Sequence, residues 1–196
     1  MPRLFVNQTL ATDSIIDLDS ELVHRLNKVL RARVGDELIL FNGHGGEYAS
    51  ELVGLNKKSA QAKVADFRQV ARESALKVNL IQGISRGNRM DYTIQKAVEL
   101  GIAGIIPVET TRSMVKLTDE RRENRHDHWR GVIRHACEQS WRTTLPDLSP
   151  AMALSDIETL TNIGSSYFLD TQSATPLTTE HKPDNVCYII AGPEGG

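Results

Sequence analysis

Long apolar runs are absent from this sequence of 196 residues, of which 40% are hydrophobic and only 5% aromatic. No stretch approaches the roughly 20 apolar residues that a membrane-spanning helix needs. The first residues also lack the apolar run of a secretion signal. The composition therefore predicts a globular protein of the cytoplasm, with its core in one large or two small domains.

Cysteine is also scarce, with only Cys137 and Cys187. Neither has a second cysteine or a histidine at the spacing of a metal site, and the histidines of residues 126–135 lack such a partner as well. We therefore expect two reduced, buried thiols and no bound metal.

Positive charge is unevenly distributed, although the net charge is only -2. Residues 71–142 carry thirteen basic and nine acidic side chains, whereas residues 143–196 carry one basic and seven acidic ones. A basic middle segment suits a phosphate-rich partner such as nucleic acid. Because acidic residues alternate with the basic ones there, a solvated helix face is the other interpretation.

The first seventy residues predict a small domain rich in strands. A strand over 3–7 precedes a helix that begins at Asp19 or Ser20. Its apolar residues share one helical face: Leu22, Val23, Leu26, Val29 and Leu30. Strands over 37–41 and 47–55 follow, joined by a glycine-rich hairpin loop, and the run over 59–67 suits an edge of the same sheet.

A polar linker over 68–74 separates this domain from a second pattern, in which strands alternate with helices. The elements expected there are a strand over 77–81, a helix over 88–100 closed by Gly101, a strand over 102–108, a helix over 119–141, and strands over 167–169 and 186–191. Such alternation is typical of a parallel sheet covered by helices. The sequence thus predicts domains over 1–70 and 74–196, the second of the α/β class.

Glycines follow the last apolar strand, in the order Gly192-Pro193-Glu194-Gly195-Gly196. A glycine-rich loop after a buried strand exposes main-chain groups at the carboxyl edge of a sheet, where open α/β folds bind ligands. The spacing matches neither a dinucleotide-binding nor a nucleoside-triphosphate motif. A ligand-binding loop and an ordinary turn both remain open at this point.

The helix expected over 119–141 ends in a second candidate segment. Arg134, Glu138 and Arg142 stand four residues apart, which predicts ion pairs along one helix face. Gln139 and Arg142 also lie near the helix end, where side chains of this kind can clamp a phosphate or a base edge.

Several short motifs occur in an order along the chain that resembles a family of bacterial enzymes. These enzymes methylate N3 of a uridine in 16S ribosomal RNA. The matching residues are Arg3-Leu4-Phe5, His24, Val29-Leu30-Arg31, Gly35-Asp36, Gln95-Lys96-Ala97, Glu99-Leu100-Gly101, Arg112-Ser113, Glu138-Gln139-Ser140, Arg142, Pro146 and Gly192-Pro193-Glu194-Gly195-Gly196. Each motif alone is weak, but the ordered set spans nearly the whole chain.

The resemblance implies a PUA-like amino-terminal β-barrel that binds RNA and an α/β methyltransferase domain of the SPOUT, or trefoil-knot, class. It also implies S-adenosylmethionine as the cofactor, 16S ribosomal RNA of the small ribosomal subunit as the partner, and a homodimer. Family members continue beyond the glycine-rich loop into segments that complete the knot, so we expect the knot region to be incomplete in this chain, which ends at Gly196.

The same resemblance assigns roles to individual residues. It implies a cofactor-binding loop made of Gly192, Pro193, Glu194, Gly195 and Gly196. It implies an RNA-binding set made of Arg25, Arg31, Arg86, Arg89, Gln139 and Arg142. Catalytic roles are expected for Arg142 and Glu194, as groups that orient the base or the cofactor.

Two other functions remain open from the sequence. A related enzyme of the same fold would methylate a ribose 2'-hydroxyl or a base of transfer RNA. A protein of a different class would bind RNA during ribosome assembly without catalysis.

Overall fold

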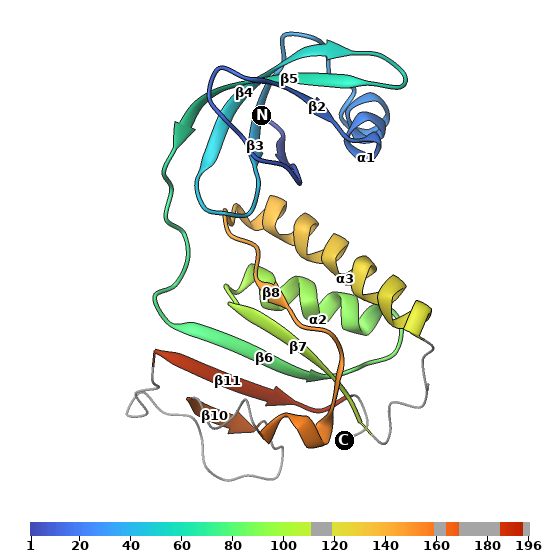
Figure 1. The fold of residues 1–196 in the computed structure, drawn as a ribbon, viewed down its shortest axis with the longest axis vertical. Helices are drawn as coiled ribbons and strands as arrows, with labels where there is room; N and C mark the ends of the chain where they lie inside the picture. Colours follow the sequence, from blue (N-terminus) through green and yellow to red (C-terminus); the bar gives the residue numbers. More distant parts are fainter. Residues whose placement is uncertain (111–118, 159–163, 169–184, 194–196) are drawn as a thin grey trace. The chain divides into compact units, whose positions relative to one another are not determined.

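The computed structural model describes residues 1–110, 119–158, 164–168 and 185–193 (Figure 1). Its contacts divide the chain into two compact units. The first unit comprises Met1–Glu73 together with Cys137–Leu145, and the second comprises Ser74–Ala136 together with Pro146–Gly196. The return of Cys137–Leu145 to the first unit is a feature for which the sequence gives no prediction.

The first unit contains a five-stranded sheet. In sheet order its strands are β1 (Arg3–Phe5), β3 (Glu37–Phe41), β4 (Glu47–Leu55), β5 (Ala60–Arg68) and β2 (Ile15–Leu18). β1 runs parallel to β3, and the other neighbours are antiparallel. The strands predicted over 37–41 and 47–55 are confirmed. The expected edge position of the third run is wrong, because β2 pairs with β5 and forms the edge instead.

A short helical segment covers the core of this unit. α1 (Ser20–His24) begins at Asp19, whose carboxylate accepts the Leu22 amide at 2.8 Å. The chain then widens into a π-helical segment, η1 (Arg25–Leu30), which ends at Arg31 in the left-handed conformation. Leu22, Val23 and Leu26 are buried against the sheet, whereas Val29 and Leu30 are exposed. The wider turn takes these last two residues off the buried face, so the single apolar face of the prediction is wrong at its end.

The second unit contains a sheet whose strands are all parallel. Its order is β10 (Ser165–Phe168), β11 (Val186–Ala191), β6 (Lys77–Gly83), β7 (Gly104–Glu109) and β8 (Asp147–Leu148), and β9 (Met152–Ala153) also pairs with β7. The predicted parallel sheet is confirmed. Its core includes Ile81, Ile106, Val108 and Tyr188 from the three central strands.

Two longer helices belong to the α/β pattern (Figure 1). α2 (Asn88–Glu99) buries Met90, Ile94 and Val98, and Gly101 follows it at φ 93°, the left-handed conformation expected of a closing glycine. α3 spans Asp119–Ser140. The helices predicted over 88–100 and 119–141 are therefore confirmed, with ends that shift by a residue. η2 (Leu154–Asp156) is a single 3-10 turn.

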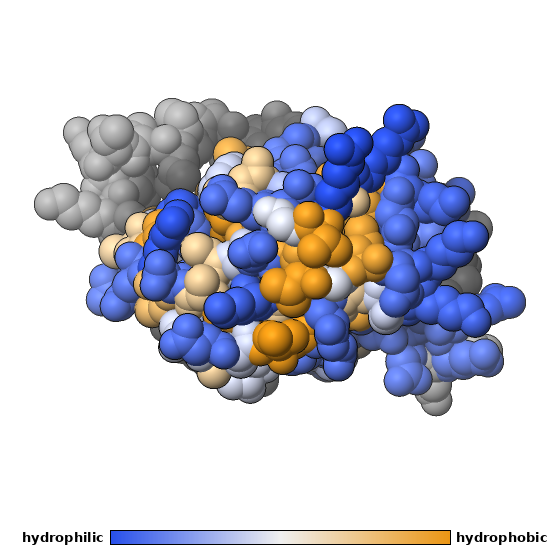
Figure 2. Space-filling model, turned by 90° about the horizontal axis from the view of Figure 1, so that it is seen from above, coloured by the Kyte–Doolittle hydropathy of each residue, from blue (hydrophilic) through white to orange (hydrophobic). Residues whose placement is uncertain are grey.

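The surface mixes hydrophilic and apolar side chains. Figure 2 shows a group of apolar side chains on one face, surrounded by hydrophilic ones. Exposed apolar side chains of the first unit include Ile15, Val29 and Val34. Within the described ranges, no helix is long and apolar enough to cross a membrane.

Candidate functional site

The carboxyl ends of β6, β7 and β11 meet at one edge of the parallel sheet. The three strands are neighbours, with Ile190 beside Ile81 and Ile81 beside Ile106 in register. Their last residues are Gly83, Glu109 and Ala191. Because ligands of open α/β sheets bind at this edge, the loops that leave these strands form the candidate site.

A buried amide joins the loop after β11 to the end of β6. The Nε2 atom of Gln82 donates to the carbonyl oxygen of Gly192 at 3.1 Å and to that of Gly83 at 2.9 Å. Gln82 is only 5% exposed, and its hydrogen bond to Gly83 is buried while the one to Gly192 is partly buried. This side chain therefore fixes where the glycine-rich loop starts.

Gly83 allows the two loops to approach closely. A Cβ atom at this position would lie 2.5 Å from Cδ and 2.7 Å from N of Pro193. Contacts this short with backbone atoms leave no room for any other residue unless the loop moves. The close approach keeps the exposed main chain of Gly192 at the edge without a covering side chain.

The predicted cofactor-binding residues fall partly within the described structure. Gly192 and Pro193 lie at the carboxyl edge, as the loop prediction requires. Glu194, Gly195 and Gly196 lie outside the described residues.

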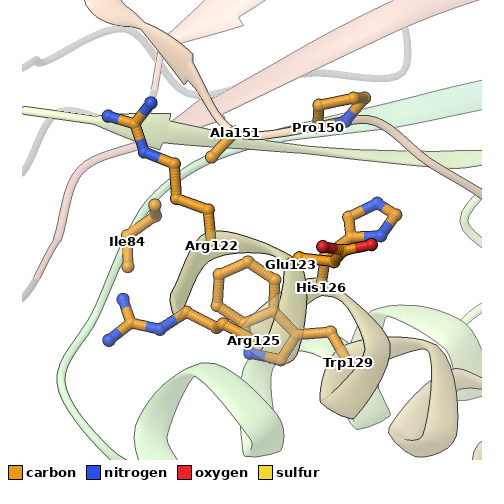
Figure 3. Close-up of a pocket in the computed structure, with 8 residues that line it drawn as sticks. All are labelled: Ile84, Arg122, Glu123, Arg125, His126, Trp129, Pro150 and Ala151. Atoms are coloured by element: carbon orange, nitrogen blue, oxygen red, sulfur yellow. The ribbon is translucent and has the colours of Figure 1, made fainter. Parts of the chain in front are cut away.

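A hollow lies in the second unit beside α3 (Figure 3). It has a volume of about 310 Å³. Its lining residues are Ile84, Arg122, Glu123, Arg125, His126, Trp129, Pro150 and Ala151. Figure 3 shows Pro150 and Ala151 facing the side chains of α3 across this space. The sequence does not predict this hollow, although Trp129, an aromatic residue within a basic helix and buried in the structure, is a possible signal for it.

Charged groups connect the hollow to the sheet edge. Arg122 Nη2 lies 3.0 Å from Glu109 Oε2, at the end of β7. The other carboxylate oxygen of Glu109 is buried and has no hydrogen-bond partner among the described residues. The guanidinium of Arg125 lies 5.9 Å from the ring centre of Trp129. A cation beside an aromatic ring in the lining of the hollow suits a flat, polar ligand.

Arg86 and Arg89 belong to the loop after β6 and the first turn of α2, and both are exposed. Arg31 is exposed at the end of η1, and Gln139 is exposed in the last turn of α3. These four predicted RNA-binding side chains thus reach solvent. The structure brings Arg86 to the same sheet edge as Gly192, because the loop that carries it starts at Gly83.

The other two predicted RNA-binding arginines lie in ion pairs of the first unit. Arg25 donates to both carboxylate oxygens of Glu138, at 3.1 Å and 2.8 Å. Glu138 is 4% exposed and also accepts the Phe5 amide at 2.9 Å. Its hydrogen bonds raise the pKa of Arg25 more strongly than burial lowers it. Arg142 is 5% exposed and pairs with Glu73.

A second buried ion cluster lies in the same unit. Glu47 lies 3.3 Å from Arg3 Nε and 3.1 Å from Arg72 Nη1. Burial lowers the pKa of Arg3, against the opposing effect of Glu47. Arg3 also donates to the carbonyl oxygens of Cys137 and Arg142, at 2.8 Å and 2.6 Å. The segment after Cys137 is thereby tied to β1.

Both cysteines are buried free thiols, as predicted. Within the described residues, no group of three or more potential ligands lies close enough together to hold a metal ion.

Comparison with known proteins gives two family matches that divide the chain. An RNA methyltransferase PUA domain matches residues 18–65, and an RNA methyltransferase domain matches residues 72–196. The predicted fold class, a PUA-like unit followed by an α/β methyltransferase unit, is confirmed.

Curated relatives include two proteins named ribosomal RNA small subunit methyltransferase E. The protein from Bacillus subtilis is 30% identical over 149 residues, which cover 74% of this chain and 58% of the relative. The protein from Buchnera aphidicola of Schizaphis graminum is 28% identical over 200 residues, which cover 100% of this chain and 80% of the relative. The chain thus spans little more than half of the first relative.

Two crystal structures share the fold over nearly the whole chain. Ribosomal RNA small subunit methyltransferase E from Neisseria gonorrhoeae, bound to S-adenosylmethionine, is 35% identical with a TM-score of 0.91, covering 100% of this chain and 81% of that protein. A methyltransferase from Legionella pneumophila, also with this cofactor bound, is 32% identical with a TM-score of 0.91, covering 99% and 80%. By both the family models and these relatives, the chain belongs to the RNA methyltransferase family that includes ribosomal RNA small subunit methyltransferase E.

Proposed function

We propose that this protein methylates small-subunit ribosomal RNA with S-adenosylmethionine as the methyl donor, and that the acceptor is N3 of a uridine in 16S ribosomal RNA. The observation that carries the proposal is the 35% identity, over the whole chain, to a ribosomal RNA methyltransferase crystallised with this cofactor. The uridine acceptor rests on the motif resemblance described above.

The residues at the carboxyl edge of the sheet fit a cofactor pocket. The main chain of Gly192 is exposed there, and a Cβ at Gly83 would collide with Pro193. We propose that Gly192 and Pro193 line this pocket, continued by Glu194, Gly195 and Gly196. S-adenosylmethionine supplies a methyl group on a sulfonium centre that is already electrophilic, so the residues mainly have to hold and align the reactants.

Gln82 acts in this proposal as a positioning residue. Its amide holds the Gly192 carbonyl and so sets the loop against β6. Replacing the amide by an apolar side chain leaves the buried carbonyl group of Gly83 and the exposed one of Gly192 without this donor. The pocket wall would then lose its fixed position while the sheet retains its core.

The proposed RNA-contacting residues are Arg31, Arg86, Arg89 and Gln139, whose side chains reach solvent. Arginine forks suit phosphates and base edges. For Arg25 and Arg142, we propose that the ion pairs with Glu138 and Glu73 hold the segment that carries Gln139. Direct RNA contacts by Arg25 and Arg142, and catalytic roles for Arg142 and Glu194, stay predictions.

The acceptor imposes a further requirement. Uridine N3 carries a proton and is engaged in base pairs, so the base has to be unpaired before it can react. A cation beside the base stabilises its anion, which is the better nucleophile. We propose that Arg86, in the loop that leaves β6, and Arg89, in the first turn of α2, supply such a charge.

The proposal is tested first by titrating the protein with S-adenosylmethionine in a calorimeter. The protein is then incubated with small-subunit ribosomal RNA and the cofactor, and the modified nucleosides are identified by mass spectrometry. We expect saturable binding and a methyl group on uridine N3. A methylated ribose or transfer RNA base would overturn the assignment of the acceptor, and absence of cofactor binding would favour an RNA-binding assembly protein.

A matched pair of variants tests the role of Gln82. We expect Gln82→Leu to weaken cofactor binding by about tenfold, as expected when a buried hydrogen bond is lost. Gln61→Leu is the control, because Gln61 makes an exposed hydrogen bond to Asp17 in the first unit. If the two variants bound the cofactor with equal affinity, Gln82 would have no positioning role at the pocket.

The cellular context is also a proposal. We propose that the protein acts in the cytoplasm as a homodimer, as the family resemblance implies. Sedimentation equilibrium of the purified protein tests the dimer directly.

A further inference from the structure

A basic groove lies in the first unit. It is formed by α1, η1 and the turn between β4 and β5. Its lining residues are Ser20, Val23, His24, Asn27, Lys28, Lys57 and Lys58, and its volume is about 680 Å³. None of these residues carries a carboxylate, and none belongs to the RNA-binding set predicted from the sequence.

One side chain fixes the two walls of the groove together. Asn27 donates from Nδ2 to the carbonyl oxygen of Val23 at 2.9 Å, within the helical segment. The same nitrogen donates to the carbonyl oxygen of Asn56 at 2.9 Å, in the turn between the strands. The backbone segments that carry the lysines of the two walls are therefore held together.

The turn itself is internally braced. Asn56 Oδ1 accepts the amides of Lys58 and Ser59, both at 2.8 Å. Its Nδ2 atom donates to Ser59 Oγ at 2.6 Å. A turn closed by a side chain in this way presents Lys57 and Lys58 from a fixed backbone.

The three lysines of the groove form no ion pair among the described residues. Within the described part of the chain, no carboxylate lies at ion-pair distance from Lys28, Lys57 or Lys58. All three lysines are exposed. Asp19, which precedes the lining residue Ser20, caps α1 by accepting the Leu22 amide. Three unpaired ammonium groups facing one groove form a positive field that attracts an anionic ligand.

We propose that this groove binds the phosphate backbone of RNA, with Lys28, Lys57 and Lys58 each facing a phosphate. The inference rests on the proposed function, in that the RNA is the methylation substrate. Lysines act as point charges towards phosphate and read no base sequence, so the groove would hold RNA without specifying the site. Val23, the only apolar residue that lines the groove, is buried, so the groove itself offers no apolar anchor for a membrane or a protein partner.

The test compares two variants that remove the same charge. Lys57→Gln/Lys58→Gln alters the groove, and Lys63→Gln/Lys77→Gln alters two exposed lysines on β5 and β6. Binding of each protein to a fluorescent single-stranded fragment of small-subunit ribosomal RNA is measured over a range of salt concentrations. The slope of log affinity against log salt reports the number of phosphate contacts, about 0.7 for each contact.

We expect the groove variant to lose about tenfold in affinity and about 1.4 in salt slope, while the control variant keeps both values. A groove variant with unchanged slope would overturn the groove assignment and leave the proposed methylation intact. If the salt slope falls in the groove variant but the unaltered protein transfers no methyl group, the result supports the groove and contradicts the proposed enzymatic function. Binding of both variants to phosphatidylserine vesicles is measured in the same way. If the groove variant loses only vesicle binding and keeps its RNA binding, the assignment of RNA as the ligand is overturned.

Discussion

Arg142 and Glu73 form an ion pair between residues that are 69 positions apart in the sequence, with Arg142 Nε 3.1 Å from Glu73 Oε2. The arginine side chain is 6% exposed and the glutamate side chain 21%. Arg142 also offers its carbonyl oxygen to Arg3. The pair therefore links the two parts of the first unit, Met1–Glu73 and Cys137–Leu145.

Arg142→Met should destabilise the first unit, because it leaves the Glu73 carboxylate without its partner. We expect a loss of about 3 kcal/mol in the free energy of unfolding, measured by urea denaturation. Arg31→Met is the control, since Arg31 is exposed at the end of η1, and its effect should stay within about 0.5 kcal/mol. Normal stability of Arg142→Met together with lost methyl transfer would instead support the catalytic role predicted from the sequence.

Glu47 gives the stability of this unit a pH dependence. Its burial raises the pKa, but the hydrogen bonds and charges of Arg72 and Arg3 outweigh this effect and hold the pKa below the ordinary value of 4.5. A carboxylate with a lowered pKa in the folded state stabilises that state above the unfolded pKa. Its contribution is lost as the pH falls through the folded pKa.

We therefore expect Glu47→Gln to be less stable than the natural protein at pH 7, and this difference to shrink as the pH falls below about 4.5. Urea denaturation at a series of pH values measures it. Glu51→Gln, an exposed change on the same strand, serves as the comparison and should show no such trend. A constant difference between natural protein and Glu47→Gln at all pH values would contradict the proposed pairing.

The two thiols should be unreactive in the folded protein. Burial raises the pKa of Cys137 to about 12, and burial also raises the pKa of Cys187. Only about one Cys137 side chain in ten thousand is then a thiolate at pH 8. A colorimetric thiol reagent should therefore titrate no cysteine in buffer and both cysteines in urea. Rapid reaction of one thiol in buffer would show that its part of the fold opens readily.

The sequence predicts the elements whose signals are local. The alternation of strands and helices, the run Val186–Ala191 and the closing Gly101 each follow from neighbouring residues, and the structure confirms them. The sequence does not predict β2, because only two of its four residues, Ile16 and Leu18, are buried. Four residues with two buried positions give too short a pattern to distinguish from a loop.

Contacts between distant residues could not be predicted in this way. Helical spacing favours Glu138 pairing with Arg134 and Arg142, yet its carboxylate binds Arg25, which is 113 positions away. Similarly, nothing near Gln82 in the sequence points to Gly192. The composition of the glycine-rich loop is enough to predict it from the sequence. The role of Gln82 follows only from the pairing of β6 with β11, which brings its side chain to Gly192.

Gly83→Ala tests whether the close approach of the two loops matters for the cofactor. The added methyl group would meet N and Cδ of Pro193, so the loop has to move away from β6. We expect cofactor affinity to fall at least tenfold in a calorimetric titration, with the far-ultraviolet circular dichroism unchanged.

Gly131→Ala is the matched control for this change. A Cβ at Gly131, within α3, meets no atom within 4 Å, and an alanine in a helix interior is favoured over glycine by about 0.5–1 kcal/mol. This variant should gain stability and bind the cofactor as the natural protein does. If Gly83→Ala also bound normally, the loop would tolerate displacement, and the pocket would not depend on where Gly192 and Pro193 lie. Because Gln82 and Gly83 act on the same loop, the double variant Gln82→Leu/Gly83→Ala should weaken binding by less than the product of the two single effects.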